Sequence, residues 1–364
     1  MTENFMKINN LQCMKRNGAS VQLKFGFAWM VLVLFFIGGL HSDVAADDPS
    51  PAVRKVTIAT IGASPSIQKN QAPEKWVEQV IGFWRGQLKP VLMSSVDLIV
   101  LPEVCDIPKG LDANEKTQYL KARKNQLLEY FASVAKAHNC YIAFGSLHEE
   151  NGIRRNSLIL LDRKGKIAGT YHKNFSTIYE MDAGIKTGEE ISVIQCDFGK
   201  VALAICFDLN FDELRHRYAE AKPDIVLFSS VYHGGLMQGA WAYSCRSFFV
   251  SSISDTRVPS EILNPLGEVI ASSTNYFNYT KATVNLDYAV AHLDYNWGRL
   301  TALKAKYGDG VTIHDPGRVG AVMITSEDKN ASALELVKEF EIELLDDYFN
   351  RSRAVRDKQL GRVD

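Results

Sequence analysis

The sequence predicts a layered α/β domain with a mixed sheet system. Segments with the apolar periodicity of strands alternate with helical segments between residues 54 and 287. Several short strands are joined by tight turns, such as those at 163–166 and 198–200, which indicates antiparallel hairpins among the strand–helix units. Because the same region contains no internal repeat, low-complexity tract or clear linker, we expect one domain of catalytic size.

The first part of this domain contains long elements. In the first helix, apolar residues recur at spacings of three and four after Pro73, a residue suited to a first helical turn. A loop is expected at 106–115, where Pro108, Gly110 and Asp112 occur together. The predicted elements are strand 54–63, helix 73–88, strand 96–101, helix 117–138 and strand 140–147.

The second part has shorter elements and begins near Arg155. An apolar run with small residues interleaved, 201–206, has the pattern of a buried strand and ends in Cys206. A turn formed by Pro265, Leu266 and Gly267 joins two of the last strands. The predicted elements are strands 157–161, 167–171, 193–196 and 201–206, helix 212–221, strand 224–228, helix 235–246, and strands 248–253, 261–263, 269–272 and 282–287.

The composition changes beyond Asp287. Two helical patterns, 297–307 and 333–348, are separated by glycine- and proline-containing turns, and we expect them to form C-terminal arms outside the main sheet. Residues 351–364 are charged and are expected to be loose.

The N-terminal segment has the features of a secretory signal peptide. Lys15 and Lys24 precede an apolar run of 16 residues, 25–40, and small residues ending at Ala46 follow it. We predict that residues 1–46 are removed and that the protein is exported, to the periplasm or the extracellular space. The alternative is an uncleaved membrane anchor, but the run is shorter than the roughly 18–20 residues that a span requires.

The net charge and the cysteine spacing argue against nucleic-acid-binding and metal-binding proteins. The hydrophobic fraction of 46% and charged fraction of 23% are those of an ordinary globular protein, and the net charge of −1 predicts no nucleic-acid partner. No cysteine pair has metal-ligand spacing, so no metal site is predicted. Removal of the leader would leave an odd number of cysteines and therefore at least one free thiol. The cysteines are Cys13, Cys105, Cys140, Cys196, Cys206 and Cys245.

Three predicted strands end in side chains that can do chemistry: Glu103, Lys173 and Cys206. Ligands of open α/β sheets bind at strand ends, so these groups could converge. A carboxylate could then take the thiol proton, an ammonium group could stabilise an oxyanion, and the thiolate could attack. Each residue also has a simpler interpretation: the cysteine as a buried core residue, and the glutamate and lysine as solvated residues at the sheet rim.

The motifs around these residues resemble those of the nitrilase, or carbon–nitrogen hydrolase, superfamily. The strand ending in Pro-Glu, the strand ending in Tyr-His-Lys and the Ile-Cys-x-Asp motif occur in the order usual for that family. The resemblance covers about 54–287 and includes a Pro-Leu-Gly-Glu turn and a closing strand. The segments are DLIVLPE (97–103), GTYHK (169–173), VALAICFD (201–208), NPLGEVIASS (264–273) and KATVNLD (281–287).

The resemblance implies roles for particular residues. Glu103 corresponds to the general base, Lys173 to the lysine on the oxyanion side and Cys206 to the nucleophile. Glu180 resembles a second glutamate that holds the lysine and substrate in many members; its alternative is an exposed loop acid. The backbone N–H of Phe207 would be the second oxyanion donor because it directly follows the nucleophile. The reaction requires no metal or organic cofactor.

Some positions depart from the family pattern. His172 stands where arginine is common, and residues 210–213 lack the usual arginine and proline. Phe207-Asp208 is closer to amide-cleaving members than to nitrile-cleaving ones. Asp208 is expected to bond backbone near the turn, and His233 to contact substrate or to cap a helix, with neither alternative favoured.

We therefore predict an amidase or N-carbamoyl amidohydrolase that cleaves a non-peptide C–N bond through a cysteine acyl-enzyme. The alternatives are a nitrilase acting on C≡N, an N-acyltransferase, and a binding protein whose site is inactive. The implied fold is a four-layer α-β-β-α sandwich over 54–287, with helical arms in a C-terminal extension, 288–364, that we assign to oligomer contact. The expected partners are a small amide or related substrate and further copies of the chain, in a homodimer or larger assembly.

Overall fold

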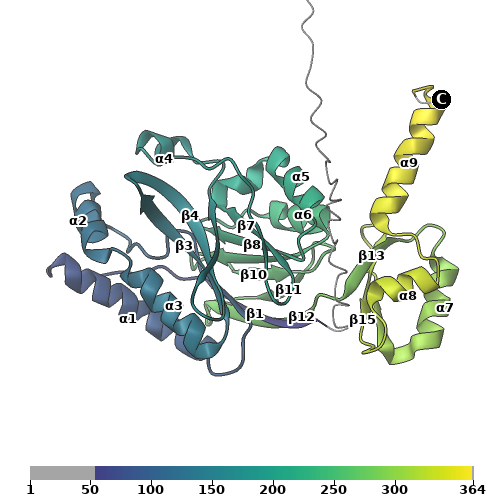
Figure 1. Cartoon of the computed structure of the whole chain (residues 1–364), viewed down its shortest axis with the longest axis horizontal. Helices are drawn as coiled ribbons and strands as arrows, with labels where there is room; N and C mark the ends of the chain where they lie inside the picture. The colour runs from purple at the N-terminus through teal and green to yellow at the C-terminus, as the bar shows by residue number, and fades with distance from the viewer. Residues whose placement is uncertain (1–53, 363–364) are drawn as a thin grey trace, which may run out of the picture. The chain divides into compact units, whose positions relative to one another are not determined.

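Two six-stranded β-sheets form the centre of the part of the chain that the structure, a computed structural model, describes, residues 54–362 (Figure 1). The predicted leader lies outside the described residues. The first sheet has the order β12 (Tyr279–Asn285), β1 (Lys55–Ile61), β2 (Leu98–Val100), β3 (Tyr141–Glu150), β4 (Ile153–Leu161) and β5 (Ile167–His172). The second has the order β11 (Val269–Ser272), β10 (Glu261–Leu263), β9 (Phe248–Ile253), β8 (Ile225–Ser230), β7 (Lys200–Ile205) and β6 (Val193–Gln195).

Each sheet has three parallel strands flanked by antiparallel ones. Strands β1, β2 and β3 are parallel, as are β7, β8 and β9. The outer strands pair antiparallel, β4 and β5 on one side of the first sheet and β12 on the other. The carboxyl ends of parallel strands lie at one edge of their sheet, so side chains that follow β2 and those that follow β7 each lie at such an edge.

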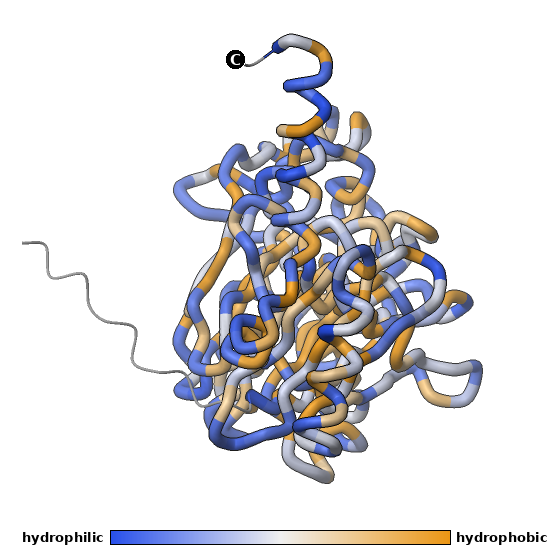
Figure 2. The backbone as a smooth tube through the Cα atoms, turned by 90° about the vertical axis from the view of Figure 1, so that its right-hand side faces the viewer, coloured by the Kyte–Doolittle hydropathy of each residue, from blue (hydrophilic) through white to orange (hydrophobic). Residues whose placement is uncertain are grey.

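The two sheets pack face to face, and helices cover their outer faces. Alternation along β2 shows this directly, because Leu98 and Val100 join the apolar cluster between the sheets whereas Ile99 joins the cluster beneath the helices. Helices α1 (Pro73–Val91) and α3 (Gln126–His138) cover the first sheet, and α5 (Asp212–Ala221) and α6 (Leu236–Cys245) cover the second. Hydrophobic segments gather in the interior of the tube, whereas hydrophilic segments lie mostly toward its edge (Figure 2). The predicted four-layer sandwich is confirmed.

Hydroxyl groups hold the two sheets together near the ends of their parallel strands. Ser229 Oγ donates to Leu101 O at 2.7 Å, and Thr60 Oγ1 donates to Ser251 O at 2.7 Å. Both hydroxyl-bearing residues are fully buried, so each hydrogen bond satisfies a polar group that could not reach water. These bonds fix how β8 and β9 of one sheet approach β1 and β2 of the other.

The predicted helix 117–138 is wrong in its extent, because the chain forms two helices there. Helix α2 (Ala113–Arg123) begins inside the predicted loop, where Asp112 and Glu115 form a capping box with both hydrogen bonds at 2.8 Å. It ends at Lys124, whose φ of +44° is left-handed and stops helix propagation. Helix α3 then begins after Asn125, so a two-residue turn replaces the middle of the predicted helix.

The C-terminal region contains a third sheet that the periodicity did not predict. It consists of β13 (Tyr288–His292), β15 (Ala321–Ser326) and β14 (Val311–His314), with α7 (Trp297–Tyr307) as predicted. The second helical pattern divides into α8 (Ala333–Glu339) and α9 (Leu345–Gln359). Most of the segment expected to be loose is helical. Acidic residues in the first turn of α9 and basic residues in its last turn stabilise that helix through its dipole. No helix within residues 54–362 is long and apolar enough to span a membrane.

A close backbone approach positions the turn after β2. Gly145 N donates to Pro102 O at 3.1 Å, and Cys105 N donates to Gly145 O at 3.0 Å. A Cβ on Gly145 would lie 2.5 Å from Pro102 O and 2.6 Å from Glu103 Cα. Only glycine therefore allows β3 to pass so close to this turn.

We predict that Gly145→Ala destabilises the protein by about 1–3 kcal/mol, because backbone atoms must move to accept the new methyl group. Gly86→Ala is the matched control: Gly86 lies in α1 with nothing within 4 Å of the position that a methyl group would occupy, so alanine there should be neutral or stabilising by up to about 1 kcal/mol. Urea unfolding measures both changes. Equal stability of the two variants would contradict the argument.

Candidate active site

Cys206 lies directly after β7, at the start of a short 3₁₀ helix, Cys206–Asn210. Its φ of +48° is left-handed, a conformation that L-residues rarely adopt and that costs about 1–3 kcal/mol unless the surroundings impose it. The next residue, Phe207, has its N–H in the first helical turn, where backbone donors have no intrahelical acceptor. The turn therefore presents a thiol and a backbone donor together.

Asp208 holds this turn in place. The side chain is completely buried, and its Oδ2 accepts hydrogen bonds from Ile205 N at 2.9 Å and from Tyr171 OH at 2.8 Å. Its Oδ1 accepts from Phe175 N at 2.8 Å. Burial raises the pKa of Asp208 to about 7. As expected, Asp208 bonds backbone near the turn, and in doing so it joins the Cys206 turn to β5 and to the segment that follows Lys173.

Glu103 approaches from the first sheet. It follows β2 and is 4% exposed. Its Oε1 accepts hydrogen bonds from Lys173 Nζ at 2.9 Å and from Asn156 Nδ2 at 2.7 Å. Its Oε2 accepts from Val231 N, just beyond β8, at 3.1 Å. Three donors from both sheets thus hold the carboxylate in one orientation.

Lys173 lies between two carboxylates. Its Nζ donates to Glu103 Oε1 at 2.9 Å and to Glu180 Oε2 at 2.9 Å, and the residue is 1% exposed. Burial alone would lower the pKa of Lys173, but the surrounding negative charges outweigh burial and raise the pKa above the ordinary lysine value. The ammonium is therefore charged at neutral pH and available as an electrostatic donor.

Glu180 belongs to a short helix, α4 (Ile178–Asp182), and not to an exposed loop. Thr177 caps this helix, and Glu180 completes the capping box by accepting from Thr177 N at 2.8 Å. Burial tends to raise the pKa of Glu180, but the charge of Lys173 and hydrogen bonds lower it below the usual value. Glu180 thus remains an anion that orients the lysine.

Asn156 is a member of this cluster that sequence reasoning missed. It lies in β4, is 3% exposed, and its Nδ2 donates to both Glu103 Oε1 and Glu180 Oε1 at 2.7 Å. Its backbone oxygen also accepts from Lys173 N at 2.9 Å. The sequence feature that could have indicated this role is the single asparagine next to the apolar strand 157–161. An asparagine buried there would need polar partners for its side-chain amide.

The electrostatic surroundings of Cys206 favour its protonated thiol over the thiolate. Burial, followed by the negative charge of Glu103, raises the pKa of the Cys206 thiol to about 12. The charge of Lys173 and a hydrogen bond with Ser230 act in the opposite direction. At neutral pH the site therefore holds a protonated thiol beside a carboxylate, which is the starting state for general-base activation.

The other candidate groups are not part of this cluster. His233 contacts Glu261 Oε2 through Nε2 at 3.1 Å, and its Nδ1 accepts from Gly235 N at 3.1 Å, so both ring nitrogens are engaged near the start of α6. All described cysteines are unpaired, and burial raises the pKa of those other than Cys206 as well. Among residues 54–362 no group of three or more His, Cys, Asp or Glu side chains has a metal-binding arrangement.

The four-layer sandwich and the cysteine at the end of a strand indicate an α/β enzyme with a cysteine nucleophile. Comparison of the sequence with protein-family models identifies the family. Residues 57–284 match the model of the carbon–nitrogen hydrolase family, and the chain belongs to that family. This agrees with the superfamily resemblance of its motifs.

Individual relatives are distant. The chain is 24% identical over 177 residues to a deaminated glutathione amidase of Dictyostelium discoideum, which covers 43% of this chain and 60% of the relative. It is 23% identical over 228 residues to the omega-amidase NIT2 of Xenopus tropicalis. That alignment covers 55% of this chain and 81% of the relative. The chain thus spans less than two thirds of the length of some curated relatives that it matches, 60% and 65% in two cases.

A solved structure shows the same fold. An amidase variant from Nesterenkonia sp. AN1, with the acetamide moiety of fluoroacetamide added covalently at its active-site cysteine, aligns with a TM-score of 0.53 at 14% identity. The alignment covers 71% of this chain and 98% of that chain.

We predict that Glu103→Gln changes thiol acidity and activity in opposite ways. After burial, the charge of Glu103 is the largest cause of the raised thiol pKa, so its removal should lower the pKa of Cys206 below about 12. Hydrolysis should nevertheless fall by about 10²–10⁴-fold, because the base is lost. Thiolate ultraviolet absorbance, taken as the difference from a Cys206→Ala variant, measures the pKa. A Cys206 pKa that rose or stayed constant in Glu103→Gln would contradict the proposed effect of the Glu103 charge on the thiol.

Proposed function

We propose that this carbon–nitrogen hydrolase is an amidase-type enzyme in which Cys206 forms an acyl-enzyme with a small non-peptide amide. One observation carries the proposal: the buried Glu103–Lys173 pair converges with Cys206 from the opposite sheet, and the charge of Glu103 acts directly on the thiol. The amidase names of the relatives support the substrate class.

In the first half-reaction the thiol sulfur of Cys206 bonds to the amide carbon while its proton passes to Glu103. The carbonyl oxygen becomes an oxyanion, which Lys173 and the Phe207 N–H stabilise. Collapse of this intermediate breaks the C–N bond, and Glu103 returns the proton to the departing ammonia or amine. A thioester on Cys206 remains.

In the second half-reaction water attacks the thioester carbon. Glu103 accepts a proton from that water, and the same donors stabilise the second oxyanion. The C–S bond then breaks, a carboxylic acid leaves, and the proton on Glu103 returns to the sulfur. The site is thereby restored, and no redox partner is required.

Ammonia release from paired aliphatic amides and nitriles tests the proposal. Wild type should act on the amide in preference to the matched nitrile, and Cys206→Ala should lower the rate by at least about 10³-fold because the nucleophile is absent. Cys140→Ala is the control. Cys140 is buried in the apolar core beneath the helices of the first sheet, outside the cluster of Glu103, Lys173 and Cys206, so this variant should retain the activity of wild type. Full activity in Cys206→Ala, or preference for the nitrile, would overturn the assignment.

We also propose that residues 1–46 are a cleaved leader and that the enzyme is exported. The short apolar run and the small residues before Asp47 support this. Expressed in a Gram-negative host, the full chain should yield a periplasmic protein that begins at Asp47, as measured by intact mass. Ala46→Arg should block processing, because the cleavage site requires a small residue. A full-length chain confined to the membrane fraction would favour the anchor instead.

A further inference from the structure

Asn156 bridges the two carboxylates of the candidate site through a single nitrogen atom. Its Nδ2 donates to Glu103 Oε1 and to Glu180 Oε1, each at 2.7 Å. A side-chain amide nitrogen carries two N–H groups, so both of them are used here. The Oδ1 of the same amide is buried and has no hydrogen-bond partner among the described residues. The contacts of this amide are therefore made by its two donors and not by its acceptor.

Lys173 closes a ring with the same two oxygen atoms. Its Nζ donates to Glu103 Oε1 at 2.9 Å and to Glu180 Oε1 at 3.2 Å. Two nitrogen donors and two carboxylate oxygens thus alternate in a hydrogen-bond ring. Rotation of the Glu103 carboxylate would break its bonds to both nitrogen atoms at once. The ring therefore holds two like charges side by side in a buried place and fixes the orientation of each.

The chemistry of the bridge explains why an amide occupies this position. A serine or threonine hydroxyl has one hydrogen atom and could donate to one carboxylate only. Lysine or arginine would add a second positive charge, which would stabilise the ionised form of Glu103 and weaken it as a base. An asparagine amide supplies two donors to the ring and adds no charge.

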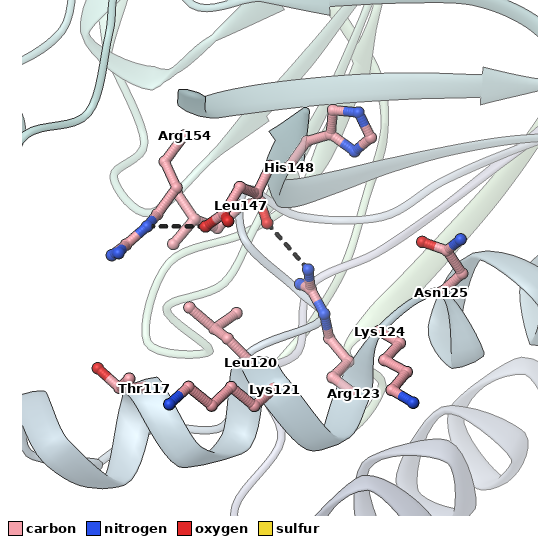
Figure 3. Close-up of a pocket in the computed structure, with 10 residues that line it drawn as sticks. Thr117, Leu120, Lys121, Arg123, Lys124, Asn125, Leu147, His148 and Arg154 are labelled. Carbon is pink, nitrogen blue, oxygen red and sulfur yellow. Dashed lines mark hydrogen bonds and ion pairs between the residues drawn. The ribbon is translucent and has the colours of Figure 1, made fainter. Parts of the chain in front are cut away.

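The backbone around Asn156 is fixed as well. Asn156 lies opposite Leu147 in the pairing of β4 with β3, and Leu147 O accepts a hydrogen bond from Arg123 Nη2 at 3.0 Å (Figure 3). Asn156 O accepts from Lys173 N at 2.9 Å, so the same residue also holds the chain that carries the lysine. Side chains mounted on paired strands are held more precisely than those on loops.

The ring occupies only one oxygen atom of Glu103. The other, Oε2, accepts a hydrogen bond from Val231 N at 3.1 Å, at the end of β8 in the second sheet. Strands β7 and β8 pair in parallel, and their register, continued by one residue, places Cys206 beside Ser230. Since Val231 directly follows Ser230, Oε2 lies on the side of the carboxylate that faces the nucleophile.

We propose that Asn156 is a positioning residue for the general base: it keeps Oε1 of Glu103 in the hydrogen-bond ring, so that Oε2 is the oxygen that accepts the thiol proton of Cys206. A carboxylate oxygen offers two lone pairs. Those of Oε1 are taken by Asn156 and Lys173, whereas Oε2 keeps one beside its bond to Val231 N. The proposal rests on the proposed function, in which Glu103 is the base.

Asn156→Leu removes both donors and keeps a branched side chain of the same shape. The Glu103 carboxylate can then rotate, and kcat for amide hydrolysis should fall by about 10–100-fold, a part of the ~10²–10⁴-fold that a general base contributes. KM should change by less than about twofold, because the amide faces the two carboxylates and not the substrate. Steady-state kinetics on a small aliphatic amide measure both constants.

Asn296→Leu is the matched control for the loss of a buried amide. Asn296 is fully buried in the C-terminal region, where its Nδ2 donates to His292 O at 2.7 Å and to Glu343 O at 2.9 Å. The substitution therefore removes two buried hydrogen bonds outside the active site. Its kcat should equal that of wild type, which separates the positioning of the base from a general loss of packing.

Asn156→Asp keeps the shape of the side chain and makes its donor depend on pH. The new carboxyl group faces Glu103 and Glu180, so burial and like charges raise its pKa above the ordinary aspartate value. When protonated it donates one hydrogen bond, and when ionised it donates none and repels both carboxylates. Activity relative to wild type at the same pH should therefore fall as the pH rises. The other titratable groups near the cluster are the same in both proteins: Lys116, Lys173, Cys206, Asp208 and Tyr232.

Modification by methyl methanethiosulfonate tests the position of the base without an amide substrate. The sulfur of Cys206 attacks the reagent, an S–S bond forms, methanesulfinate leaves and the thiol proton passes to Glu103. Because the pKa of this thiol is raised to about 12, the reaction at neutral pH depends on the base. Its rate should fall by about tenfold or more in Asn156→Leu and stay constant in Asn296→Leu. Cys206→Ala provides the background from the other cysteines.

The positioning role is refuted if Asn156→Leu retains the kcat and the modification rate of wild type, or if its KM rises while kcat is unchanged. An Asn156→Asp variant with the pH profile of wild type would also refute it. Slower modification of Cys206 in Asn156→Leu, in an enzyme that proves inactive on every amide, would contradict the proposed function and still support the positioning role. The two failures are therefore distinguishable.

Discussion

The rest of the site depends on the burial of Lys173 between two carboxylates. A charged ammonium that is 1% exposed is tolerated only when opposite charges and hydrogen bonds surround it, and Glu103 and Glu180 supply them at 2.9 Å. Loss of one partner from such a group typically costs about 3–5 kcal/mol. The ends of β2 and β5 and the short helix α4 must therefore meet at this point, and Asn156 completes the arrangement by donating to both carboxylates.

The second sheet meets this charged cluster through a strained turn. Cys206 adopts its left-handed conformation because the buried Asp208 binds backbone on both sides of the gap between the sheets. Cross-sheet hydroxyls, such as that of Ser229, set the separation of the layers. The thiol therefore lies in the field of Glu103, which holds the proton on sulfur and is itself the group that can remove it. The raised pKa of the thiol and the proposed activation step have the same physical origin.

Sequence patterns located most of the sheet and helix framework, since apolar periodicity reports directly which side of an element is buried. They failed where local geometry interrupts a periodic pattern. The helix predicted across Lys124 is interrupted by one left-handed residue, and lysine carries no sequence signal for that conformation. The third sheet was not predicted because its strands are short, with β13 directly after β12 and with β14 and β15 between α7 and α8.

By itself the sequence determined that Glu103, Lys173 and Cys206 stand at or just beyond the ends of strands, because Glu103 and Cys206 follow apolar runs and Lys173 follows the short strand-like segment 167–172. Only the tertiary structure decided which groups surround them. The contacts of Glu103 with Asn156 and Lys173 span 53 and 70 residues. The local sequence around a polar side chain in a strand is the same whether or not the folded protein supplies a hydrogen-bond partner for it. The partners of buried charges come from elements that are distant in sequence. Chain folding alone brings those elements within hydrogen-bond distance.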